Sequence, residues 1–300
     1  MKLKEVTRKD YQERILRVLV YIQQNLDDDI SLEELAEVAY FSPYHFHRVF
    51  RGMLGESIGE HIRRLRLERA AFRLKHSDLP VTCIAFEAGY ETHEAFTRAF
   101  RAMFSYSPSR YRSAKKPLFF QSIPSGIHYG DSQSPEQTQT IFIQEGIMDV
   151  QIKRIEPFKV AFVRHTGPYA ECKPAWDNLC TWAGPRGLFK PETRFIGISY
   201  DDPDVTPPEN IRYDACMTLE DDVEAQGDVG IQFISGGDYA VTSHVGPYTN
   251  LSVTYARLCG QWAPSSGREL RSAPCFEVYL NDPDKTPPEK LLTEIYVPLE

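Results

Sequence analysis

The chain has 300 residues, of which 42% are hydrophobic and 12% aromatic, and this is enough apolar material for well-packed cores in two domains. The formal net charge of −8 argues against nucleic-acid binding over the whole surface, and no apolar run is long enough to cross a membrane. The charge is divided unevenly, however. Residues 1–116 contain 20 Lys and Arg against 16 Asp and Glu, a net charge of +4, and the rest carries −12, which predicts two parts with different partners.

Cysteine usage indicates a reducing compartment. The six cysteines show no CxxC spacing and lie within apolar segments, at positions 83, 172, 180, 216, 259 and 275. Buried thiols explain this pattern better than disulfides or a metal site. We therefore expect a cytoplasmic protein with no bound metal and no cofactor.

Helical periodicity opens the chain. Apolar residues recur every 3.6 positions from Tyr11 to Leu26, which predicts a helix that Asp27-Asp28-Asp29 ends. Ser31 then supplies an N-cap for a short amphipathic helix over 32–39. A comparable segment is expected over 84–90, a short helix with Gly89 at its turn.

One pattern follows each of these short helices, at 42–55 and again at 92–105. Each copy opens with a hydroxyl residue, places Phe at i and i+4 and Arg at i+2 and i+5, and predicts a helix with one apolar and one basic face. The predicted exposed faces are Tyr44, His45, His47, Arg48 and Arg51 in the first copy and His93, Glu94, Thr97, Arg98 and Arg101 in the second. A helical bundle with solvated arginines is the alternative, but two matched copies favour two helix-turn-helix units that bind DNA.

This region resembles the DNA-binding domain of the AraC/XylS transcription regulators, from about Tyr11 to Arg112. The most specific matches are 84–90, Phe96 to Phe100 and the ending Ser107 to Arg112. The resemblance implies seven helices, with a long helix from Ser57 to Lys75 joining the two units. It also implies that both reading helices enter successive major grooves, about 34 Å apart. Ser105-Tyr106 stands where the family usually has a glycine and a small apolar residue, which leaves the local exit of the second unit in question.

The long joining helix carries a basic cluster of Arg63, Arg64, Arg66 and Arg69. We expect some of these arginines to pair with Glu60 and Glu68 rather than with phosphates. After it, residues 117–140 are rich in Ser, Gln, Pro and Gly. They are either a linker or a strap docked through Phe119, Phe120 and Ile123.

Period-two alternation replaces the helical stripe from Met148 onward. Strands are expected over 150–155, 160–163, 195–200 and 213–219, with a helix around Trp176 to Trp182. The same order returns about eighty residues later: His165-Thr166-Gly167-Pro168-Tyr169 becomes His244-Val245-Gly246-Pro247-Tyr248, and 202–209 becomes 282–289. This is a duplicated β-α-β-β unit related by a pseudo-twofold.

The fold class is therefore multidomain, α followed by α+β. It comprises an N-terminal all-α double helix-turn-helix domain over 1–116, a linker over 117–147 and a C-terminal duplicated domain over 148–300. Because the basic balance lies in the first part, we expect a fragment ending near Lys116 to fold and bind DNA alone.

The two copies differ at one position where burying a charged side chain would cost free energy. Gly197 in the first corresponds to Glu277 in the second, on the strand side that we expect to face away from the helices. A carboxylate within an apolar strand needs a partner. That partner is either an internal Arg or Lys, or a cationic ligand among aromatic rings.

The duplicated region resembles the GyrI-like small-molecule-binding domain, across roughly Met148 to Glu300. The supporting motifs are the two Gly-Pro-Tyr turns, residues 275–280 and the ending Glu294 to Pro298. The resemblance implies an aromatic cleft with a central glutamate that favours lipophilic cations. The candidate ligand-binding residues are Glu277, Tyr296, Tyr279, Tyr169, Tyr248 and Trp176.

Together these features predict a sequence-specific transcription regulator whose C-terminal domain senses a small, lipophilic or cationic effector. Its expected partners are double-stranded DNA and the effector, with RNA polymerase as a further candidate and no membrane. The alternative is a GyrI-like hydrolase of reactive compounds fused to a DNA reader, with Glu277 as a base. We assign no catalytic residue, because His165 and His244 lie symmetrically in turns, which favours a structural role.

Overall fold

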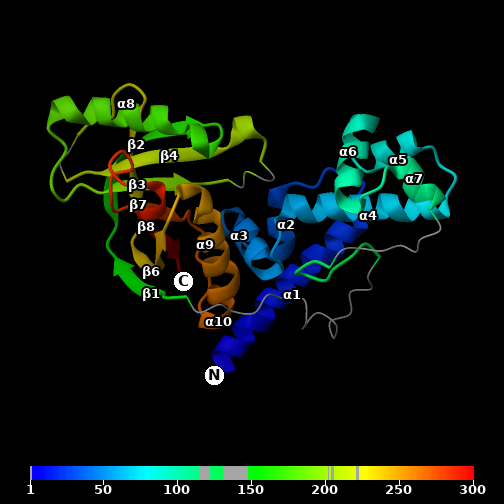
Figure 1. The fold of residues 1–300 in the computed structure, drawn as a ribbon. Coiled ribbons are helices and arrows are strands. Elements are labelled where there is room, and N and C mark those ends of the chain that lie inside the picture. Colours follow the sequence, from blue (N-terminus) through cyan, green and yellow to red (C-terminus); the bar gives the residue numbers. More distant parts are fainter. Residues whose placement is uncertain (1, 115–121, 131–147, 202, 204–205, 221–222) are drawn as a thin grey trace.

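The computed structural model describes residues 2–114, 122–130, 148–201, 203, 206–220 and 223–300 (Figure 1). Its N-terminal helices are α1 (Lys2–Gln24), α2 (Leu32–Ala39), α3 (Pro43–Leu54), α4 (Ile58–His76), α5 (Val81–Glu87), α6 (His93–Phe104) and α7 (Pro108–Ser113). The longer elements of the second part are β1 (Gln151–Ile155), β2 (Phe158–Thr166), α8 (Lys173–Ala183), β3 (Phe195–Ser199), β4 (Arg212–Thr218), β5 (Val229–Ile234), β6 (Gly237–Val245), α9 (Leu251–Arg257), η6 (Leu258–Trp262), α10 (Ala263–Ser266), β7 (Phe276–Tyr279) and β8 (Leu292–Pro298). None of the helices in these described ranges has the length and apolar character to span a membrane.

Side-chain caps set the starts of α2, α4 and α6 that the sequence predicts, whereas the Ser42 side chain makes no cap hydrogen bond at the start of α3. Ser31 accepts a hydrogen bond from the Glu34 amide at the start of α2, and Thr92 accepts one from the Ala95 amide at the start of α6. Ser57 and Glu60 form a reciprocal capping box that begins α4. This single helix then passes from the first helix-turn-helix unit to the second (Figure 1), as the family resemblance implies.

The residues that end α3 and α6 have the same backbone conformation. Gly55 ends α3 with φ of 77°, and Ser105 ends α6 with φ of 62°, so both residues are left-handed. Each amide donates back to an arginine carbonyl one turn earlier, on Arg51 and Arg101. The serine thus leaves the turn unchanged, although a non-glycine residue in this conformation costs on the order of 1 kcal/mol.

Part of the segment after α7 docks on α4. Ile127 is almost fully buried, and the side chain of His128 and the amide of Tyr129 both contact the Glu68 carboxylate. Phe119 and Phe120 lie outside the described residues, whereas Ile123 is half-buried. The docked-strap interpretation is therefore correct for residues 125–129, through contacts that the sequence analysis did not name.

The second part is one eight-stranded antiparallel sheet with the order β1-β6-β8-β7-β3-β4-β2-β5. The central pair, β3 and β7, joins the two copies and places Gly197 opposite Glu277. Each copy has a leading strand before its β-α-β-β unit, and the one in the first copy, β1, is the strand expected over 150–155. These leading strands are exchanged, since β1 pairs with β6 of the other copy and β5 pairs with β2.

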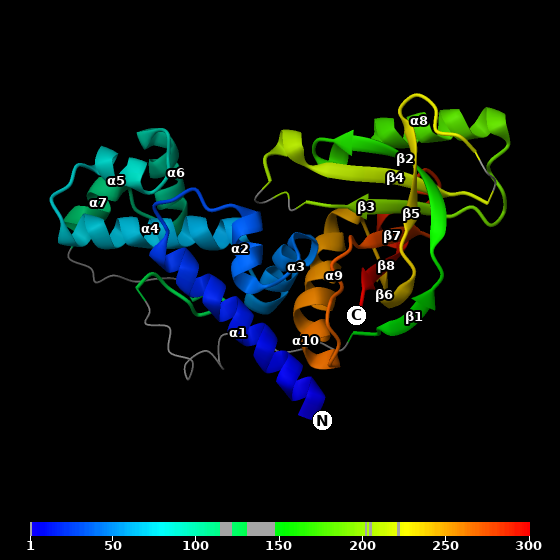
Figure 2. The same cartoon turned by 180° about the vertical axis from the view of Figure 1, so that it is seen from behind.

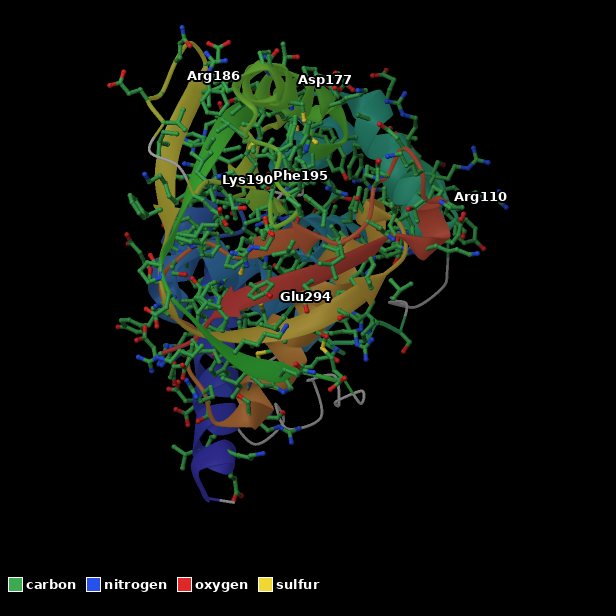
Figure 3. The ribbon with its side chains drawn as sticks, turned by 90° about the vertical axis from the view of Figure 1, so that its left-hand side faces the viewer. Arg110, Asp177, Arg186, Lys190, Phe195 and Glu294 are labelled. Atoms are coloured by element: carbon green, nitrogen blue, oxygen red, sulfur yellow. The ribbon has the colours of Figure 1, made fainter. Side chains whose placement is uncertain are left out.

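Helices cover only one face of this sheet. Helix α8 packs over β2 and β4, while α9 and α10 lie over the other half (Figure 2). The opposite face has its own apolar cluster, which includes Ile198, Phe276 and Val278. Figure 3 looks toward the sheet from the side and labels Glu294 on β8, with Asp177 on α8 near the top.

The helical and sheet parts share one hydrophobic core. Phe46 and Phe50 of α3 belong to the same buried cluster as Leu258 and Cys259 of η6, and α1 packs against α10. Figure 1 shows α3 beside α9. Within the described N-terminal helices, the second helix-turn-helix unit has a separate core, around Phe96 and Phe100. The expectation that residues 1–116 fold alone stays a prediction, although cutting the chain there would expose part of the shared core to water.

Candidate functional site: DNA-reading helices and the Glu277 site

The polar face of α6 is open to solvent. Glu94, Arg98 and Arg101 are exposed and His93 and Thr97 are half-buried, while Phe96 and Phe100 anchor the opposite face. This is the amphipathic arrangement that the sequence predicts, and it leaves two guanidinium groups free of burial on one helical face. The face has the shape and charge of a helix that enters a major groove.

The matching face of α3 is covered instead. His45 and Arg48 are only 1% and 6% exposed, and Tyr44, His47 and Arg51 are half-buried. The His45 Nε2 atom lies 2.8 Å from the Arg271 carbonyl oxygen, on the sheet part of the chain. The expectation of an exposed reading face is therefore wrong for α3, because the C-terminal part packs onto it.

A close backbone contact permits this packing. A Cβ atom on Gly52 of α3 would lie 1.9 Å from the Ala256 carbonyl oxygen, and one on Gly260 would lie 2.5 Å from the Gly52 Cα atom. Only glycine fits at these two positions, since the obstructing atoms are backbone. We call the α3 surface formed by His45, Arg48 and Gly52 the docked face.

The helix that receives the docked face is irregular. Element η6 is a π-helix, whereas the first copy continues as regular α-helix through Thr181. The irregularity coincides with one extra residue, because Cys180 and Trp182 are two positions apart while Cys259 and Trp262 are three apart. A π-turn accommodates such an insertion, and here it presents Gly260 to α3.

Glu277 is buried on the helix-covered face, 3% exposed, and is held by three hydroxyl groups. Tyr279 donates to Oε2 at 2.7 Å, and Tyr255 of α9 and Ser199 of β3 donate to Oε1 at 3.0 and 3.4 Å. Burial raises the pKa of Glu277, an effect that these hydrogen bonds and the charge of Arg48 partly oppose. We call these four residues, with Tyr213, the Glu277 site.

The expected orientation of the central strands is wrong. Gly197, Ser199, Glu277 and Tyr279 face the helices, whereas their apolar neighbours line the opposite cluster. Gly197 lies directly beside the carboxylate, and no Cβ atom fits at this position. A Cβ atom there would meet the Tyr279 and Tyr213 hydroxyl oxygens at 2.3 and 2.6 Å, so glycine makes room for these two phenols.

Most of the aromatic residues predicted to bind the ligand lie at or beside the Glu277 site. Trp176 and Tyr248 lie 5.8 and 5.1 Å from Tyr279 between ring centroids, and Tyr169 lies 6.1 Å from Tyr213. The sequence analysis missed Tyr213, whose hydroxyl lies 2.9 Å from that of Tyr279. The alternation of Tyr213, Ala215 and Met217 along β4 could have identified it, because all three side chains belong to the core on the helix-covered side of the sheet.

Tyr296 does not belong to this group. It pairs with Phe276 across the sheet, stacks on its ring at 4.5 Å, and donates a hydrogen bond to Glu294. Successive strand residues face opposite sides, so Tyr296 lies on the face away from Glu277. Its assignment to the wall of the same cleft is wrong.

Arg48 reaches the Glu277 site from α3. Its guanidinium carbon lies 3.9 Å from the centroid of the Tyr255 ring, and Nη2 donates to the Ser199 carbonyl oxygen at 3.3 Å. The Nη1 atom is buried and finds no hydrogen-bond partner in the described parts of the chain. The direct partners of the buried carboxylate are thus three hydroxyl groups, which neither alternative named, and Arg48 adds a nearby positive charge that lowers the pKa of Glu277.

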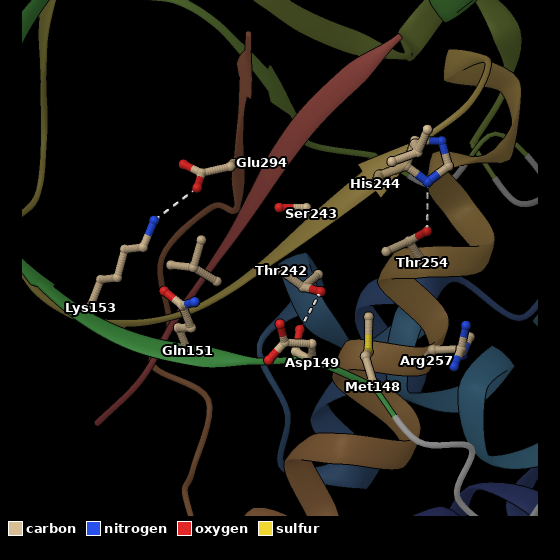
Figure 4. A pocket seen from close by; sticks show the side chains of 12 residues that line it. Met148, Asp149, Gln151, Lys153, Thr242, Ser243, His244, Thr254, Arg257 and Glu294 are labelled. Carbon is tan, nitrogen blue, oxygen red and sulfur yellow. Dashed lines mark hydrogen bonds and ion pairs between the residues drawn. The ribbon is translucent and has the colours of Figure 1, made fainter. Parts of the chain in front are cut away.

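A groove lies away from the Glu277 site, where β6 extends past its pairing with β1. This groove of about 360 Å³ is lined mainly by polar side chains (Figure 4). Lys153 pairs there with Glu294 at 2.8 Å, and His244 Nδ1 lies 2.8 Å from the Thr254 hydroxyl. The Nε2 atoms of His165 and His244 contact the carbonyls of Pro168 and Pro247 in equivalent turns, which supports their structural interpretation.

Fold and site together define a paired helix-turn-helix protein joined to a duplicated sheet unit with a central buried carboxylate. Residues 148–300 match the model of the GyrI-like small molecule binding domain, and residues 35–114 match that of a helix-turn-helix domain. The chain belongs to the GyrI-like family and carries an AraC-type helix-turn-helix region before it.

Curated relatives match parts of the chain. YbfP of Bacillus subtilis, an uncharacterized HTH-type transcriptional regulator, is 36% identical over 35% of this chain and 36% of its own length. The transcriptional regulator Rob of Salmonella typhimurium is 32% identical over 40% of this chain and 41% of its own. The chain thus spans well under half of these two relatives. The probable regulator YgiV of Escherichia coli is 30% identical over 51% of this chain and 96% of its own.

Solved structures resemble the chain more distantly. The C-terminal domain of EcmrR covers 52% of this chain at 20% identity, with a TM-score of 0.43 and 99% of its own length matched. A protein titled as a hydrolase from Listeria innocua covers 55% of this chain at 15% identity, with a TM-score of 0.39 and 98% of its own length matched.

Proposed function

We propose that this protein is a sequence-specific DNA-binding transcription regulator whose GyrI-like unit senses a lipophilic cation at the Glu277 site. One combination of features carries the proposal: the chain exposes a basic reading helix, α6, and buries a carboxylate among tyrosines elsewhere. The curated names of YbfP, Rob and YgiV as regulators support it.

DNA recognition is assigned first to α6. Arg98 lies near the middle of the exposed face, where a guanidinium can form two parallel hydrogen bonds with guanine in the major groove. Arg101 lies one turn further on, where it can contact a phosphate. Neither arginine needs to leave the protein core to do this.

Replacing Arg98 by Ala is expected to weaken binding to a selected DNA site by about 1–3 kcal/mol, with a much smaller loss on random DNA. Fluorescence anisotropy at fixed salt concentration measures both affinities. Arg110→Ala is the matched control, because it removes an exposed arginine of α7 rather than of α6. Equal weakening on both DNAs would reassign Arg98 to phosphate contact.

The carboxylate and the phenol rings of the Glu277 site support the proposed binding of a cation. A buried carboxylate surrounded by phenol rings attracts a lipophilic cation by its charge, while the ring faces add cation–π attraction. Burial raises the pKa of Tyr255 and of Tyr279, so both remain neutral hydrogen-bond donors at neutral pH. An anion of the same shape would meet an unfavourable field.

Replacing Glu277 by Gln keeps the side-chain volume and removes the charge. We expect this variant to lose about 1–3 kcal/mol of binding free energy for tetraphenylphosphonium. Isothermal titration calorimetry measures the loss, and tetraphenylborate serves as the anionic comparison of similar shape. Glu294→Gln is the matched control, since Glu294 lies on the opposite face of the sheet. An unchanged preference for the cation in Glu277→Gln would make Glu277 a purely structural residue.

A further inference from the structure

Protein side chains take up the space around the Glu277 carboxylate. One of them, Arg48, comes from α3 in the helix-turn-helix region. Three hydroxyl groups and the Tyr255 ring surround the carboxylate, and the Arg48 guanidinium lies over that ring on the side of α3. Arg48 touches both copies of the duplicated unit, through Ser199 of the first and Tyr255 of the second. A ligand between the copies would meet this side chain.

Arg48 has the chemistry of the ligand that the site would prefer. It is a flat cation whose centre lies 3.9 Å from the Tyr255 ring, and its two neighbours, Tyr255 and Ser199, are the same residues that donate to Glu277. The guanidinium is imperfectly satisfied, because Nη1 is buried without a hydrogen-bond partner among the described residues. A buried cation with one unpaired donor is held less firmly than a fully paired one.

We propose that Arg48 is an internal cation occupying the effector position, so that a lipophilic cation and the docked face of α3 exclude one another. Effector binding at the Glu277 site then expels Arg48 and releases α3 to join α6 on DNA. This regulation rests on the proposed function, because it assigns the effector to the same site. In the docked state α6 alone is available to DNA.

Competition between Arg48 and a cation predicts a measurable change in the affinity for the cation. A ligand that binds only the undocked state has its apparent affinity reduced by the fraction of molecules in that state. Removing the internal competitor must therefore tighten cation binding, because the three hydroxyl donors of Glu277 stay in place. A merely structural arginine would have the opposite effect, since its loss would damage the site.

The direct test is the affinity of the full-length protein for tetraphenylphosphonium in Arg48→Met and Arg48→Ala. Calorimetry is expected to show binding at least about tenfold tighter than in wild type, with Arg110→Met, an exposed arginine of α7, unchanged as the control. Unchanged or weaker binding in both folded variants would overturn the competition. No binding by wild type, Arg48→Met or Arg48→Ala would overturn the proposed function itself, so the two failures are distinguishable.

Cys275 provides a second readout within the native chain. Its thiol is buried, and its Sγ atom lies 3.6 Å from His45 Nδ1 on the docked face. Saturating tetraphenylphosphonium is expected to accelerate alkylation of Cys275 by iodoacetamide at least about tenfold, as measured by peptide mass spectrometry. Cys216, buried in the cluster on the opposite sheet face, is the internal control. A cation that binds tightly and leaves the Cys275 rate unchanged would show that α3 stays docked and would refute the release step.

Discussion

Glu68→Ala is expected to lower the free energy of unfolding by about 3–5 kcal/mol, because it leaves buried donors without their shared acceptor. Glu68 is fully buried on α4, where Oε1 accepts from Arg64 Nη1 and lies 3.0 Å from His128 Nδ1. Oε2 accepts from the Tyr129 amide at 2.8 Å. One carboxylate thus fastens the strap of residues 125–129 to the helix that joins both DNA-reading units.

Urea unfolding at neutral pH measures this loss. Glu60→Ala is the matched control on the same helix, because the Glu60 side chain is exposed and serves only the capping box with Ser57. Its removal should cost about 1 kcal/mol. Similar losses for the two variants would mean that the buried network around Glu68 contributes little beyond a surface cap.

The second large effect is expected from Gly260→Leu, which should force α3 away from the sensing unit. The added Cβ atom would lie 2.5 Å from the Gly52 Cα atom and 2.6 Å from the Val49 carbonyl oxygen, and neither backbone atom can rotate aside. Overpacking of this kind costs about 1–3 kcal/mol. Since only the docked state bears that cost, the docking equilibrium should shift about 5- to 150-fold toward free α3.

We expect Gly260→Leu to bind a selected DNA site more tightly than wild type in the absence of any cation, by anisotropy titration. Thr181→Leu is the matched control, because Thr181 follows Cys180 as Gly260 follows Cys259, and it is exposed on α8. Circular dichroism establishes that both variants are folded. A folded Gly260→Leu with wild-type DNA affinity would contradict the view that docking restrains α3.

The sequence alone predicted the two helix-turn-helix units, the duplication and the unusual carboxylate. It assigned the wrong face of the sheet to Glu277, and the reason is physical. Both faces of β7 are buried, Phe276 and Val278 on one side and Glu277 and most of Tyr279 on the other. Alternation then indicates two faces but does not indicate which one the helices cover.

The docking of α3 could not be predicted from hydrophobic periodicity, because α3 and α6 have nearly the same pattern of apolar and basic residues. The difference lies in single positions: Gly52 of α3 corresponds to Ala102 of α6, and Gly260 corresponds to Thr181. A glycine inside a helix costs about 1 kcal/mol relative to alanine and therefore suggests a packing reason. Two such glycines in distant segments meet only in the folded chain.

In the regulation that we propose, α3 is withheld from DNA until a cation takes the place of Arg48. Hydroxyl-radical footprinting tests it most directly, on a duplex selected from random sequences by the wild-type protein with saturating tetraphenylphosphonium. Without the cation, we predict protection of a single groove segment, from α6. With the cation, a second protected segment should appear about one helical turn away, roughly 10 base pairs. Two protected segments of equal strength in both conditions would contradict the account.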